Sequence, residues 1–575
     1  MDRVIMFDAR LGKWMEFSRP VEIVRRHSSD ECLDALCHVE RIVRERNVYA
    51  AGFLSYEAAP AFDRALHTRP ADPTFPLLWF GIFEERNPLR LPSSGSHETL
   101  NWQPTISREQ YRAAIGRIKH YIAEGDTYQV NFSFRLASRC TVDPYAFFLQ
   151  LVRSQPSANG AFIETPDFAV CSASPELFFQ MEGETITTRP MKGTATRGMT
   201  LHDDLTRGDA LRTSEKNRAE NVMIVDMMRN DLGRIADVGT VAVPSLFAIE
   251  KYPTVWQMTS TVTAKTTASI VEIMKALFPC CSVTGAPKAR TMQIIAELET
   301  TPRKIYTGAI GFFESNRRAQ FNVAIRTVVM DKRKGEAEYG TGGGVVWAST
   351  PDGEYEECLT KARVLTHARP EFELFETILF TQEKGFFLLE EHLGRLRDSA
   401  AYFDYPMDTA VMMRMLTMLD ADLRRFSHDC RVRLVLHRDG QPTFAIRPIR
   451  RASVPVRLKL ASVPVDSNNV FLYHKTTNRN VYDGALAAVP DCDDVLLWNE
   501  RGEITESTVA NVVVELDGAL FTPPVSCGLL AGTFREALLR EGKITERIIM
   551  KDELSKASRL FLVNSLREWR NAYLV

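Results

Sequence analysis

A regular alternation of apolar and polar residues in the run TYQVNFSFRL constrains the fold of this chain more than any other feature. The apolar residues are Tyr128, Val130, Phe132, Phe134 and Leu136, and the residues between them are Gln129, Asn131, Ser133 and Arg135. A period of two predicts a half-buried strand. An amphipathic helix is predicted before it over 108–126, and hairpins with Asp-Gly turns are predicted at 431–449 and 511–524. The chain is therefore expected to be α+β, with substantial antiparallel sheet.

Composition excludes several classes of function. A formal net charge of −2 over 575 residues gives no overall field that would recruit nucleic acid or an acidic membrane. The N-terminal segment has early acidic residues, which argues against a signal peptide, and no apolar run reaches the roughly 18 residues of a transmembrane helix. The ten cysteines are scattered without C-x-x-C spacing, so reduced thiols and a cytoplasmic location are expected.

Two segments have the composition of a long loop or of a boundary between domains. Residues 83–107 are rich in Pro, Ser, Gly and charge, and are predicted to form a long surface loop inside the first unit. Residues 366–372 follow a helical segment and precede a strand-like run. We therefore expect two domains, over 1–366 and 372–575, although length alone allows roughly three or four domain-sized units.

The segment RPMKGT places Lys192 between Pro190 and Gly193. In a phosphate-binding P-loop the glycines precede the lysine, whereas here the glycine follows it, so nucleotide binding is unsupported. Two interpretations stay open from these residues alone: a solvated lysine in a surface turn, or a lysine held there to react.

Three glutamates are candidates for binding a metal. Glu354 and Glu357 share a helix stripe with Lys361, apart from the apolar stripe of that helix. Glu220 begins a strongly apolar helix, where an unpaired carboxylate is costly. Mg²⁺ prefers one or two carboxylates plus substrate oxygens, so glutamates from two helix starts could converge on it. The alternative for Glu354 and Glu357 is a solvated helix face.

Other residues suit an anion. Gly342, Gly343 and Gly344 enter an apolar strand and allow backbone N–H groups to approach an anion closely, although glycines also make bulges. Arg326 interrupts the apolar run FNVAIRTVV, which favours a role as a carboxylate ligand. Thr284 lies in a turn that leads into a helix, where backbone donors are available.

Eight segments together resemble the chorismate-utilising enzyme family, and their order and spacing match over 100–365. They are GDTYQVNFSFRL, SASPELFF, RPMKGT, AENVMIVDMMRNDLGR, SVTGAPKARTMQIIAELE, YTGAIGFF, FNVAIRT and GTGGGVVWASTPDGEYEECLTKA. The resemblance implies the β-sandwich, α+β fold of anthranilate synthase component I. Anthranilate synthases carry a small residue where this chain has Lys192, which instead resembles component I of aminodeoxychorismate synthase.

The resemblance also implies residue roles. Lys192 would add to C2 of chorismate as the C4 hydroxyl leaves, after which ammonia adds at C4 and the lysine is expelled. Glu176 matches the general acid for the departing hydroxyl. Glu220 and Glu357 match Mg²⁺ ligands, with Glu354 as a companion. The substrate-binding positions are Arg326, Lys361, Gly342, Gly343, Gly344, Thr284, Tyr306 and Thr194.

Two positions depart from the anthranilate synthase pattern. Asn217 stands where those enzymes have a further glutamate, so a wetter metal shell is expected. Gln257 stands where several relatives have a histidine that assists pyruvate loss. Its absence suits an enzyme that stops at aminodeoxychorismate.

The region after residue 370 carries a second group of candidates. Lys475 follows an apolar strand, Glu506 precedes small hydroxyl residues, and Arg395 lies on an amphipathic helix. Gly532 and Thr533 open a helix, a position that suits a phosphate. Each residue alone is unremarkable, and a surface lysine is the ordinary interpretation of Lys475.

Together these residues resemble the fold-type-IV pyridoxal phosphate enzymes over 372–575, which have two subdomains. The resemblance implies that Lys475 holds the cofactor covalently and that Glu506 pairs with its pyridine nitrogen. Arg395, Thr533 and Gly532 would bind the phosphate. Thr508 and Tyr482 are further expected cofactor contacts, although the spacing of Tyr482 from the lysine departs from the aminotransferase pattern.

The combination predicts a bifunctional enzyme that makes 4-aminobenzoate on the route to folate, using Mg²⁺ and pyridoxal phosphate. The second domain would act as a 4-amino-4-deoxychorismate lyase, with Lys475 removing the C4 proton. The substrates would be chorismate and ammonia, the ammonia coming from solution or a separate glutamine amidotransferase subunit, and a homodimer would form through the second domain. The alternatives are an anthranilate-type synthase fused to a branched-chain or D-amino acid aminotransferase, and a non-catalytic chorismate-binding paralogue.

Overall fold

The computed structural model describes residues 2–92, 100–366, 370–449 and 454–575, which form two compact units. The first unit comprises Met1–Thr196 and Gly208–Arg369, and the second comprises Arg197–Arg207 and Pro370–Val575. The expected boundary near residue 370 falls partly on residues 367–369, outside the described part of the chain. The segment Arg197–Arg207 lies far before that boundary in the sequence, but it belongs to the second unit.

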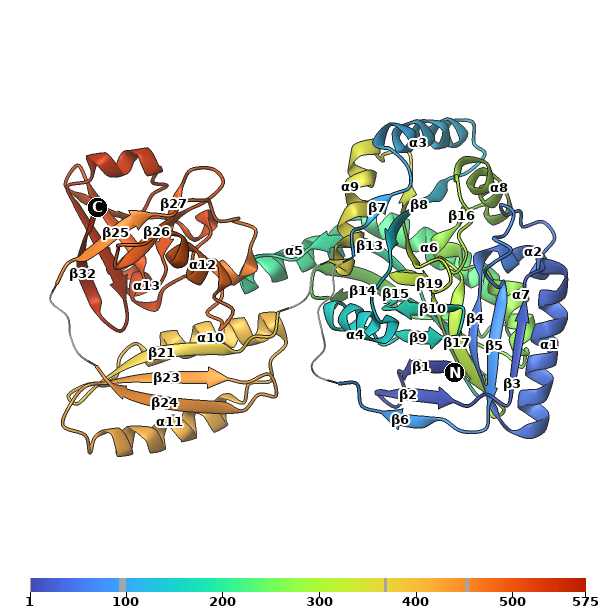
Figure 1. Cartoon of the computed structure of the whole chain (residues 1–575), viewed down its shortest axis with the longest axis horizontal. Helices are drawn as coiled ribbons and strands as arrows, with labels where there is room; N and C mark the ends of the chain where they lie inside the picture. The colour runs from blue at the N-terminus through green and yellow to red at the C-terminus, as the bar shows by residue number, and fades with distance from the viewer. Residues whose placement is uncertain (1, 93–99, 367–369, 450–453) are drawn as a thin grey trace. The chain divides into compact units, whose positions relative to one another are not determined.

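The first unit contains two ten-stranded sheets (Figure 1). The first sheet contains β16 (Gly285–Ala286), β8 (Gln129–Arg139), β20 (Glu336–Val345), β19 (Thr327–Asp331), β10 (Phe168–Ser172), β9 (Ala161–Glu164), β1 (Arg3–Asp8), β2 (Lys13–Ser18), β6 (Asn87–Leu89) and β7 (Gln103–Pro104). The second contains β13 (Met191–Thr196), β15 (Val255–Lys265), β12 (Thr185–Arg189), β11 (Leu177–Glu182), β18 (Arg318–Val323), β17 (Ala309–Glu314), β4 (Tyr49–Leu54), β5 (Leu78–Phe83), β3 (Glu22–Arg26) and β14 (Ala242–Lys251). The pairings within both sheets are antiparallel, as the sequence predicts.

Apolar clusters hold the two sheets and their helices together. One joins strands of the two sheets and includes Phe17, Phe53 and Trp79. A second joins α1 (Ser29–Arg46), α6 (Glu215–Gly233) and α7 (Ile270–Leu277) to strands of the second sheet. A third joins α3 (Arg108–Ala123), α4 (Pro144–Ser154), α8 (Lys288–Leu298) and α9 (Pro351–Ala362) to the first sheet. This sandwich with outer helices confirms the predicted fold class.

Two of the crossings from one sheet to the other lie next to each other. Glu176 lies on the crossing from β10 to β11, and Arg326 lies on the crossing from β18 to β19. Backbone hydrogen bonds join the crossings, because Ala173 N–H donates to the Arg326 carbonyl and Val323 N–H donates to the Glu176 carbonyl. These bonds place a candidate acid and a candidate anion ligand at the same end of the sandwich.

Three local predictions differ from the structure. The apolar runs of residues 168–188 predict two strands around a turn, but the segment forms β10 in the first sheet and the neighbouring strands β11 and β12 in the second. Arg326 is not inside a strand: it has φ of 51° between β18 and β19. Lys192 lies in strand β13 rather than in a turn, at an irregularity where the register with β15 shifts between Met191 and Thr194. Such a bulge redirects a side chain out of the regular ladder.

The second unit has the two predicted subdomains (Figure 1). One is a four-stranded sheet of β22 (Gly385–Phe386), β21 (Leu374–Thr381), β23 (Cys430–Leu436) and β24 (Pro442–Pro448), packed with α10 (Leu389–Phe403) and α11 (Thr409–Leu423). The other is an eight-stranded sheet of β27 (Ile504–Ser507), β26 (Asp494–Trp498), β25 (Val456–Leu460), β32 (Glu568–Leu574), β31 (Arg559–Asn564), β28 (Asn511–Leu516), β29 (Ala519–Thr522) and β30 (Thr545–Glu546). Helices α12 (Asn480–Ala488) and α13 (Thr533–Arg540) accompany the second sheet.

The segment Arg197–Arg207 is built into the second unit by specific contacts. Arg197 forms a buried ion pair with Asp204 at 2.6 Å and lies 4.3 Å from the centre of the Tyr402 ring. The Tyr402 hydroxyl donates to the Gly198 carbonyl at 2.8 Å. The fold of the second unit therefore includes residues from well before the expected domain boundary.

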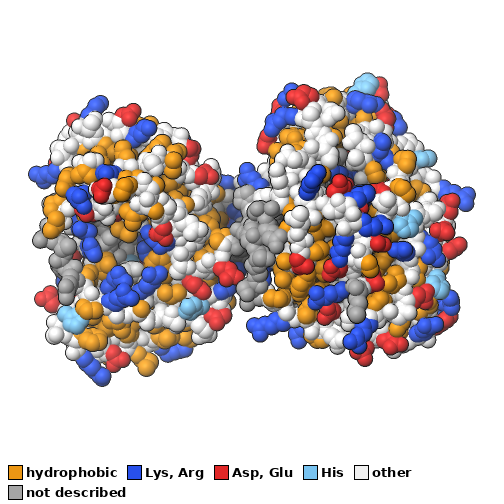
Figure 2. All heavy atoms as spheres, in the orientation of Figure 1, with side chains coloured by type: hydrophobic (Ala, Val, Ile, Leu, Met, Phe, Trp, Pro, Cys, Tyr) orange, Lys and Arg blue, Asp and Glu red, His pale blue; other side chains and the backbone are white. Residues whose placement is uncertain are grey.

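On the face shown in Figure 2, acidic and basic side chains are interspersed over both units, and neither sign of charge predominates. None of the helices in the described ranges has the length and apolar content needed to cross a membrane.

Candidate active sites

A cavity of about 400 Å³ in the first unit gathers most of the residues that the sequence predicts. Its wall comes from both sheets, from α6 and from α9. The predicted residues that line it are Glu176, Lys192, Thr194, Glu220, Tyr306, Arg326, Gly342, Gly344, Glu354, Glu357 and Lys361. Two sheet crossings, a bulge and two helices therefore converge on one cavity.

Lys192 is presented to this cavity by the bulge in β13. Gly193 has φ of 97°, a left-handed backbone that favours glycine, and Gln257 Nε2 donates to its carbonyl at 2.8 Å. Burial lowers the pKa of Lys192, and Lys361 acts in the same direction, although the nearby Glu220 opposes both. A lowered pKa increases the neutral fraction, which is the nucleophilic form of a lysine.

Glu176 is a buried carboxyl group that can hold a proton near neutral pH. Burial raises its pKa to about 7, although a hydrogen bond from Ser282 and the charge of Lys192 pull the other way. The Ser282 hydroxyl donates to Glu176 Oε1 at 2.6 Å and fixes the orientation of the carboxyl group. Ser282 was not predicted from the sequence. Glu176 has the properties of a general acid.

The three predicted metal ligands face the cavity in different electrostatic states. Burial raises the pKa of Glu354, and Ser349 donates a hydrogen bond to its Oε1 at 2.7 Å. Burial acts in the same direction on Glu357, but the ammonium group of Lys361, 2.7 Å away, outweighs it and lowers the pKa of Glu357. Among the residues that the structure describes, no three His, Cys, Asp or Glu side chains lie close enough to bind a metal by themselves.

Arg326 and Lys361 lie together on one wall. The Arg326 guanidinium donates to the Lys361 carbonyl, and Lys361 Nζ donates to the Gly342 carbonyl at 2.9 Å. The left-handed backbone of Arg326 is strained for a residue with a side chain, and such strain concentrates at functional sites. The pair forms a cationic wall suited to a carboxylate.

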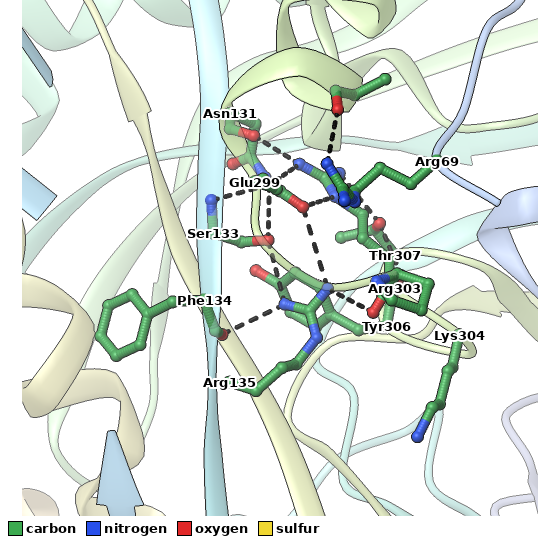
Figure 3. A network of polar contacts seen from close by, with 12 residues as sticks. Arg69, Asn131, Ser133, Phe134, Arg135, Glu299, Arg303, Lys304, Tyr306 and Thr307 are labelled. Atoms are coloured by element: carbon green, nitrogen blue, oxygen red, sulfur yellow. Dashed lines mark hydrogen bonds and ion pairs between the residues drawn. The ribbon is translucent and has the colours of Figure 1, made fainter. Parts of the chain in front are cut away.

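Tyr306 is held against the cavity by the buried polar network in Figure 3. Glu299 accepts hydrogen bonds from Arg303 at 2.6 and 3.0 Å, and Arg135 lies 3.9 Å from the same carboxylate. The guanidinium of Arg135 lies 5.0 Å from the centre of the Tyr306 ring. Arg303 also donates to the carbonyls of Asn131 and Val283, at 2.6 and 3.0 Å. This network fixes the end of the cavity that Tyr306 lines.

Two predicted substrate contacts lie differently from expectation. The Thr284 hydroxyl donates to the carbonyls of Cys280 and Cys281, and Thr284 does not line the cavity. Gly342, Gly343 and Gly344 lie inside β20, paired with β8, so much of their backbone hydrogen bonding is committed to the sheet. Their lack of side chains has a second use, because a Cβ on Gly343 would lie 2.8 Å from Glu354 Oε2. Their binding of a carboxylate stays a prediction.

A second cavity, of about 450 Å³, lies in the C-terminal unit between its two sheets. It gathers all the residues predicted for the second group: Arg395, Lys475, Tyr482, Glu506, Thr508, Gly532 and Thr533. They come from α10, α12, β27, α13 and the segments between these elements.

Lys475 is buried beside cations. Burial lowers its pKa to about 8, and Arg395 contributes in the same direction. Its Nζ lies 4.9 Å from the centre of the Phe375 ring. His474, the preceding residue, is fixed on both ring nitrogens, by Ser399 Oγ at 2.9 Å and by the Met199 carbonyl at 3.1 Å. The surface interpretation of Lys475 is therefore wrong, because its amine is buried among charged side chains of the cavity.

Glu506 is surrounded by hydrogen-bond donors. The Tyr482 hydroxyl donates to Oε1 at 2.8 Å, the Leu530 amide donates to the same oxygen at 3.1 Å, and Asn511 donates to Oε2 at 3.1 Å. Burial nevertheless raises the pKa of Glu506 to about 7. Tyr482 thus contacts Glu506, the predicted partner of the pyridine nitrogen, although its spacing from Lys475 departs from the aminotransferase pattern.

The predicted phosphate ligands are linked by a carboxylate that was not predicted. Glu376 in β21 accepts hydrogen bonds from Arg395 at 2.9 and 2.7 Å and lies 2.7 Å from His392 Nδ1. The other ring nitrogen of His392 lies 3.4 Å from the Thr533 hydroxyl. Burial disfavours ionisation of Glu376, but Arg395 and His392 overcome it and hold its pKa well below the usual range. Glu376 therefore orients both Arg395 and Thr533.

Gly532 and Thr508 have structural reasons for their positions. A Cβ on Gly532 would lie 2.0 Å from Asn511 Oδ1, so a side chain cannot fit there. The Thr508 hydroxyl donates to Asp494 at 2.5 Å, which closes one side of the cavity. Thr533 is the first residue of α13, where unpaired backbone N–H groups favour an anion.

Three arginines on the opposite wall were missed. Arg431 and Arg433 alternate along β23, and Arg479 precedes α12. Burial lowers the pKa of Arg433, and so does repulsion from Arg431 and Arg479. Within the described residues, Arg431 and Arg433 have no acidic partner. The run RVRLVL carries this signal, because its arginines fall on the same face of a strand.

Comparison with known proteins agrees with both halves of the chain. Residues 2–367 match the chorismate binding enzyme family, and residues 373–573 match amino-transferase class IV. Aminodeoxychorismate synthase component 1 of Bacillus subtilis is 43% identical over 265 residues, which are 46% of this chain and 56% of that protein. Anthranilate synthase component 1 1 of Haloarcula marismortui is 40% identical over 273 residues, 47% of this chain and 55% of that protein.

The chain therefore spans little more than half of each of these two relatives, and overall identity does not separate their two activities. Among solved structures, anthranilate synthase component I from Streptococcus pneumoniae TIGR4 matches with a TM-score of 0.54 at 22% identity, covering 64% of this chain and 92% of that one. At this identity the likeness supports the fold of the first unit.

Proposed function

Because this chain belongs to the chorismate binding enzymes and continues into a class IV aminotransferase region, we propose that it makes 4-aminobenzoate from chorismate in two steps. The first unit would convert chorismate and ammonia to 4-amino-4-deoxychorismate. The second would eliminate pyruvate from that product. The observation that carries the first step is Lys192, a lysine with a lowered pKa that lines the same cavity as a protonatable Glu176.

The first step uses these two residues as nucleophile and acid. The neutral Lys192 amine forms a bond to C2 of the ring, the two conjugated ring double bonds each shift by one position, and the C4–O bond breaks. Glu176 gives its proton to the departing hydroxyl, which leaves as water. Ammonia then bonds to C4, both double bonds return to their original positions, and the C2–N bond to Lys192 breaks. Arg326 and Lys361 would hold a carboxylate of the substrate.

Magnesium fits the carboxylates of this cavity. Glu220, Glu354 and Glu357 face one space from two helices, and Mg²⁺ is commonly bound by one or two carboxylates together with substrate oxygens. When bound, the ion would neutralise and orient a substrate carboxylate.

Pyridoxal phosphate fits the second cavity by its donor set. Lys475 is available for the aldehyde, Glu506 for the pyridine nitrogen, and Arg395 with Thr533 for the phosphate. When bound, the cofactor supplies an electron sink. Lys475, with a pKa of about 8, can take the proton from C4 of the substrate, and formation of an aromatic ring drives the loss of pyruvate.

The arginine-lined wall favours a lyase over a branched-chain aminotransferase. Aminodeoxychorismate carries two carboxylates, whereas a branched-chain amino acid carries one carboxylate and an apolar side chain. Arg431, Arg433 and Arg479 add cationic groups beyond those at the phosphate position. Half-buried arginines without an acidic partner, as Arg431 and Arg433 are among the described residues, are favourable when a polyanionic ligand binds them.

The ammonia source and assembly belong to the same proposal. A separate glutamine amidotransferase subunit would supply ammonia, as the "component 1" in the name of the Bacillus subtilis relative suggests for that protein. A homodimer through the second unit, a cytoplasmic location and a place in folate synthesis complete the proposal.

Product analysis tests both steps. The full chain is incubated with chorismate, ammonium, Mg²⁺ and pyridoxal phosphate, and the aromatic products are separated by chromatography. We expect 4-aminobenzoate from the wild type, accumulated aminodeoxychorismate from Lys475→Ala, and neither from Lys192→Ala. Formation of 2-aminobenzoate would refute the first step, and aminodeoxychorismate without 4-aminobenzoate from the wild type would refute the second.

A further inference from the structure

The polar face of β8 is buried, although a half-buried strand was predicted from its alternation. Gln129 is 0% exposed and Asn131 is 7% exposed, while apolar Tyr128 beside them is 69% exposed. Further along this face, Ser133 Oγ donates to Glu299, and Arg135 donates to Ser133 Oγ and lies 3.9 Å from Glu299, although Arg135 Nε has no hydrogen-bond partner among the described residues. The polar residues of this strand therefore point into the protein rather than toward water.

Gln129 differs from Ser133 and Arg135 because its side chain has no partner. Neither Oε1 nor Nε2 of Gln129 forms a hydrogen bond with any residue in the described part of the chain. Asn131 Nδ2, two residues along the same face, is also buried and unpartnered. Burying an amide without partners costs stability, so such groups in a functional cavity call for a ligand or a mobile partner.

The unpaired amide of Gln129 lies next to the candidate nucleophile. A Cβ on Gly344 would lie 2.4 Å from Lys192 Nζ and 2.9 Å from Gln129 Nε2, so the two groups flank the same point. No hydrogen bond of Lys192 Nζ to a described residue is present either. The Lys192 amine and the Gln129 amide, both without a hydrogen-bond partner among the described residues, thus lie close to the same point above Gly344 in β20, where there is no side chain.

We propose that Gln129 is a positioning residue for Lys192, a role that rests on the proposed function: its amide, turned over so that the oxygen rather than Nε2 faces the amine, accepts a hydrogen bond from the neutral amine and directs the nitrogen lone pair at the substrate ring. A neutral amine has two N–H donors and one lone pair, so one accepted hydrogen bond fixes its orientation and leaves the lone pair free. A carboxylate in this position would favour the charged amine instead. An apolar side chain would leave the amine without orientation. Glutamine orients the amine without charging it.

Gln129→Leu tests the role because leucine has a similar size and lacks the amide. We expect kcat for ammonia-dependent aminodeoxychorismate formation to fall about 10- to 100-fold, the range typical for loss of a partner that orients a functional group. The KM for chorismate should change little, because the substrate-binding residues are untouched. The thermal midpoint should stay the same or rise, because a buried unpaired amide has been removed. If Gln129 had only a structural role, Gln129→Leu would instead lower the thermal midpoint and leave kcat unchanged.

Thr188→Val is the matched control. Thr188 Oγ1 is also buried and unpartnered within the described residues, and it lies in β12 of the same unit, away from the cavity wall. This variant should keep the wild-type kcat. Gln129→Met serves as a second apolar variant if the leucine chain has a reduced thermal midpoint, and the same loss of kcat is expected from it.

A direct readout follows the amine itself. In single-turnover experiments without ammonia, the chorismate adduct on Lys192 is quantified by mass spectrometry, and its formation should slow in Gln129→Leu by about the same factor as kcat. If the wild type makes aminodeoxychorismate and Gln129→Leu forms the adduct at the wild-type rate, the positioning role is refuted while the proposed function stands. If the wild type forms neither adduct nor aminodeoxychorismate, the proposed function itself fails.

Discussion

Replacing Gly344 with alanine should impair the chemistry of the first site without unfolding the protein. The added Cβ would lie 2.4 Å from Lys192 Nζ, whereas ordinary contacts of a Cβ begin near 3.4 Å. The amine must therefore retreat by about 1 Å, a displacement that can cost a reacting group about a hundredfold in rate. This corresponds to about 2.7 kcal/mol in the activation free energy.

The same substitution should not lower the free energy of unfolding. Gly344 does not have a left-handed backbone, and the atoms nearest to the new methyl group are the ends of the Lys192 and Gln129 side chains. Restricting the unfolded chain contributes about 0.4–1 kcal/mol of stability, which offsets small local rearrangements. We therefore expect a thermal midpoint equal to or slightly above that of the wild type.

Gly342→Ala is the matched comparison because it lies in the same strand, two residues away. There the Cβ would lie 2.5 Å from the backbone carbonyl oxygen of Phe132, which cannot retreat without moving β8. This variant should lose about 1–3 kcal/mol of stability. The assays are kcat with chorismate and ammonia, and the thermal midpoint. A Gly344→Ala chain with wild-type kcat, or with the same loss of midpoint as Gly342→Ala, would contradict this reasoning.

Three further predictions concern buried charges. For the wild type, kcat/KM of amination should fall as pH rises through about 7, because Glu176, with its pKa raised to about 7, keeps its proton only below that pH. Glu176→Gln should be at least about a hundredfold slower, and its rate should not show this fall with rising pH. Initial rates measured over a range of pH check both expectations. Glu376→Gln should weaken pyridoxal phosphate binding about 10- to 100-fold by releasing Arg395 from its buried ion pair, and titration of the visible absorbance of the bound cofactor checks this. Arg197→Ala should remove the buried ion pair with Asp204 and destabilise the second unit, which thermal unfolding measures, although residue 197 lies far before that unit's main segment in the sequence.

Local periodicity predicted the elements that carry many of the site residues. The helix with Glu354, Glu357 and Lys361 on one stripe forms as α9, and all three side chains line the cavity, although the Glu357 side chain is also 51% exposed, so the solvated-face alternative fails for Glu354 only. The helix carrying Arg395 forms as α10, and the helix start at Thr533 forms as α13. These features depend on spacing within a single element, which the sequence contains in full.

The errors arose where distant segments decide the outcome. A period of two shows that the faces of β8 differ, but not that the polar face is covered by other strands and by the Glu299 network. Arg326 has apolar neighbours on both sides because each belongs to a strand in a different sheet, so the crossing between them is invisible locally. Glu376 pairs with Arg395 and His392 across a gap that neither strand nor helix spacing predicts.

Both candidate lysines are prepared by the same physical effect on unrelated frameworks. Burial is the largest cause of the lowered pKa for Lys192 and for Lys475. The surroundings then act in opposite directions: Glu220 is the strongest influence that raises the pKa of Lys192, whereas Arg395 lowers that of Lys475 further. The reactivity of Lys192 therefore depends more on how its amine is oriented and on a cation that neutralises the neighbouring carboxylates. Lys475 reaches a pKa of about 8 from the residues of its own cavity. This difference explains why an uncharged amide such as Gln129, rather than a carboxylate, is the neighbour that suits the Lys192 amine.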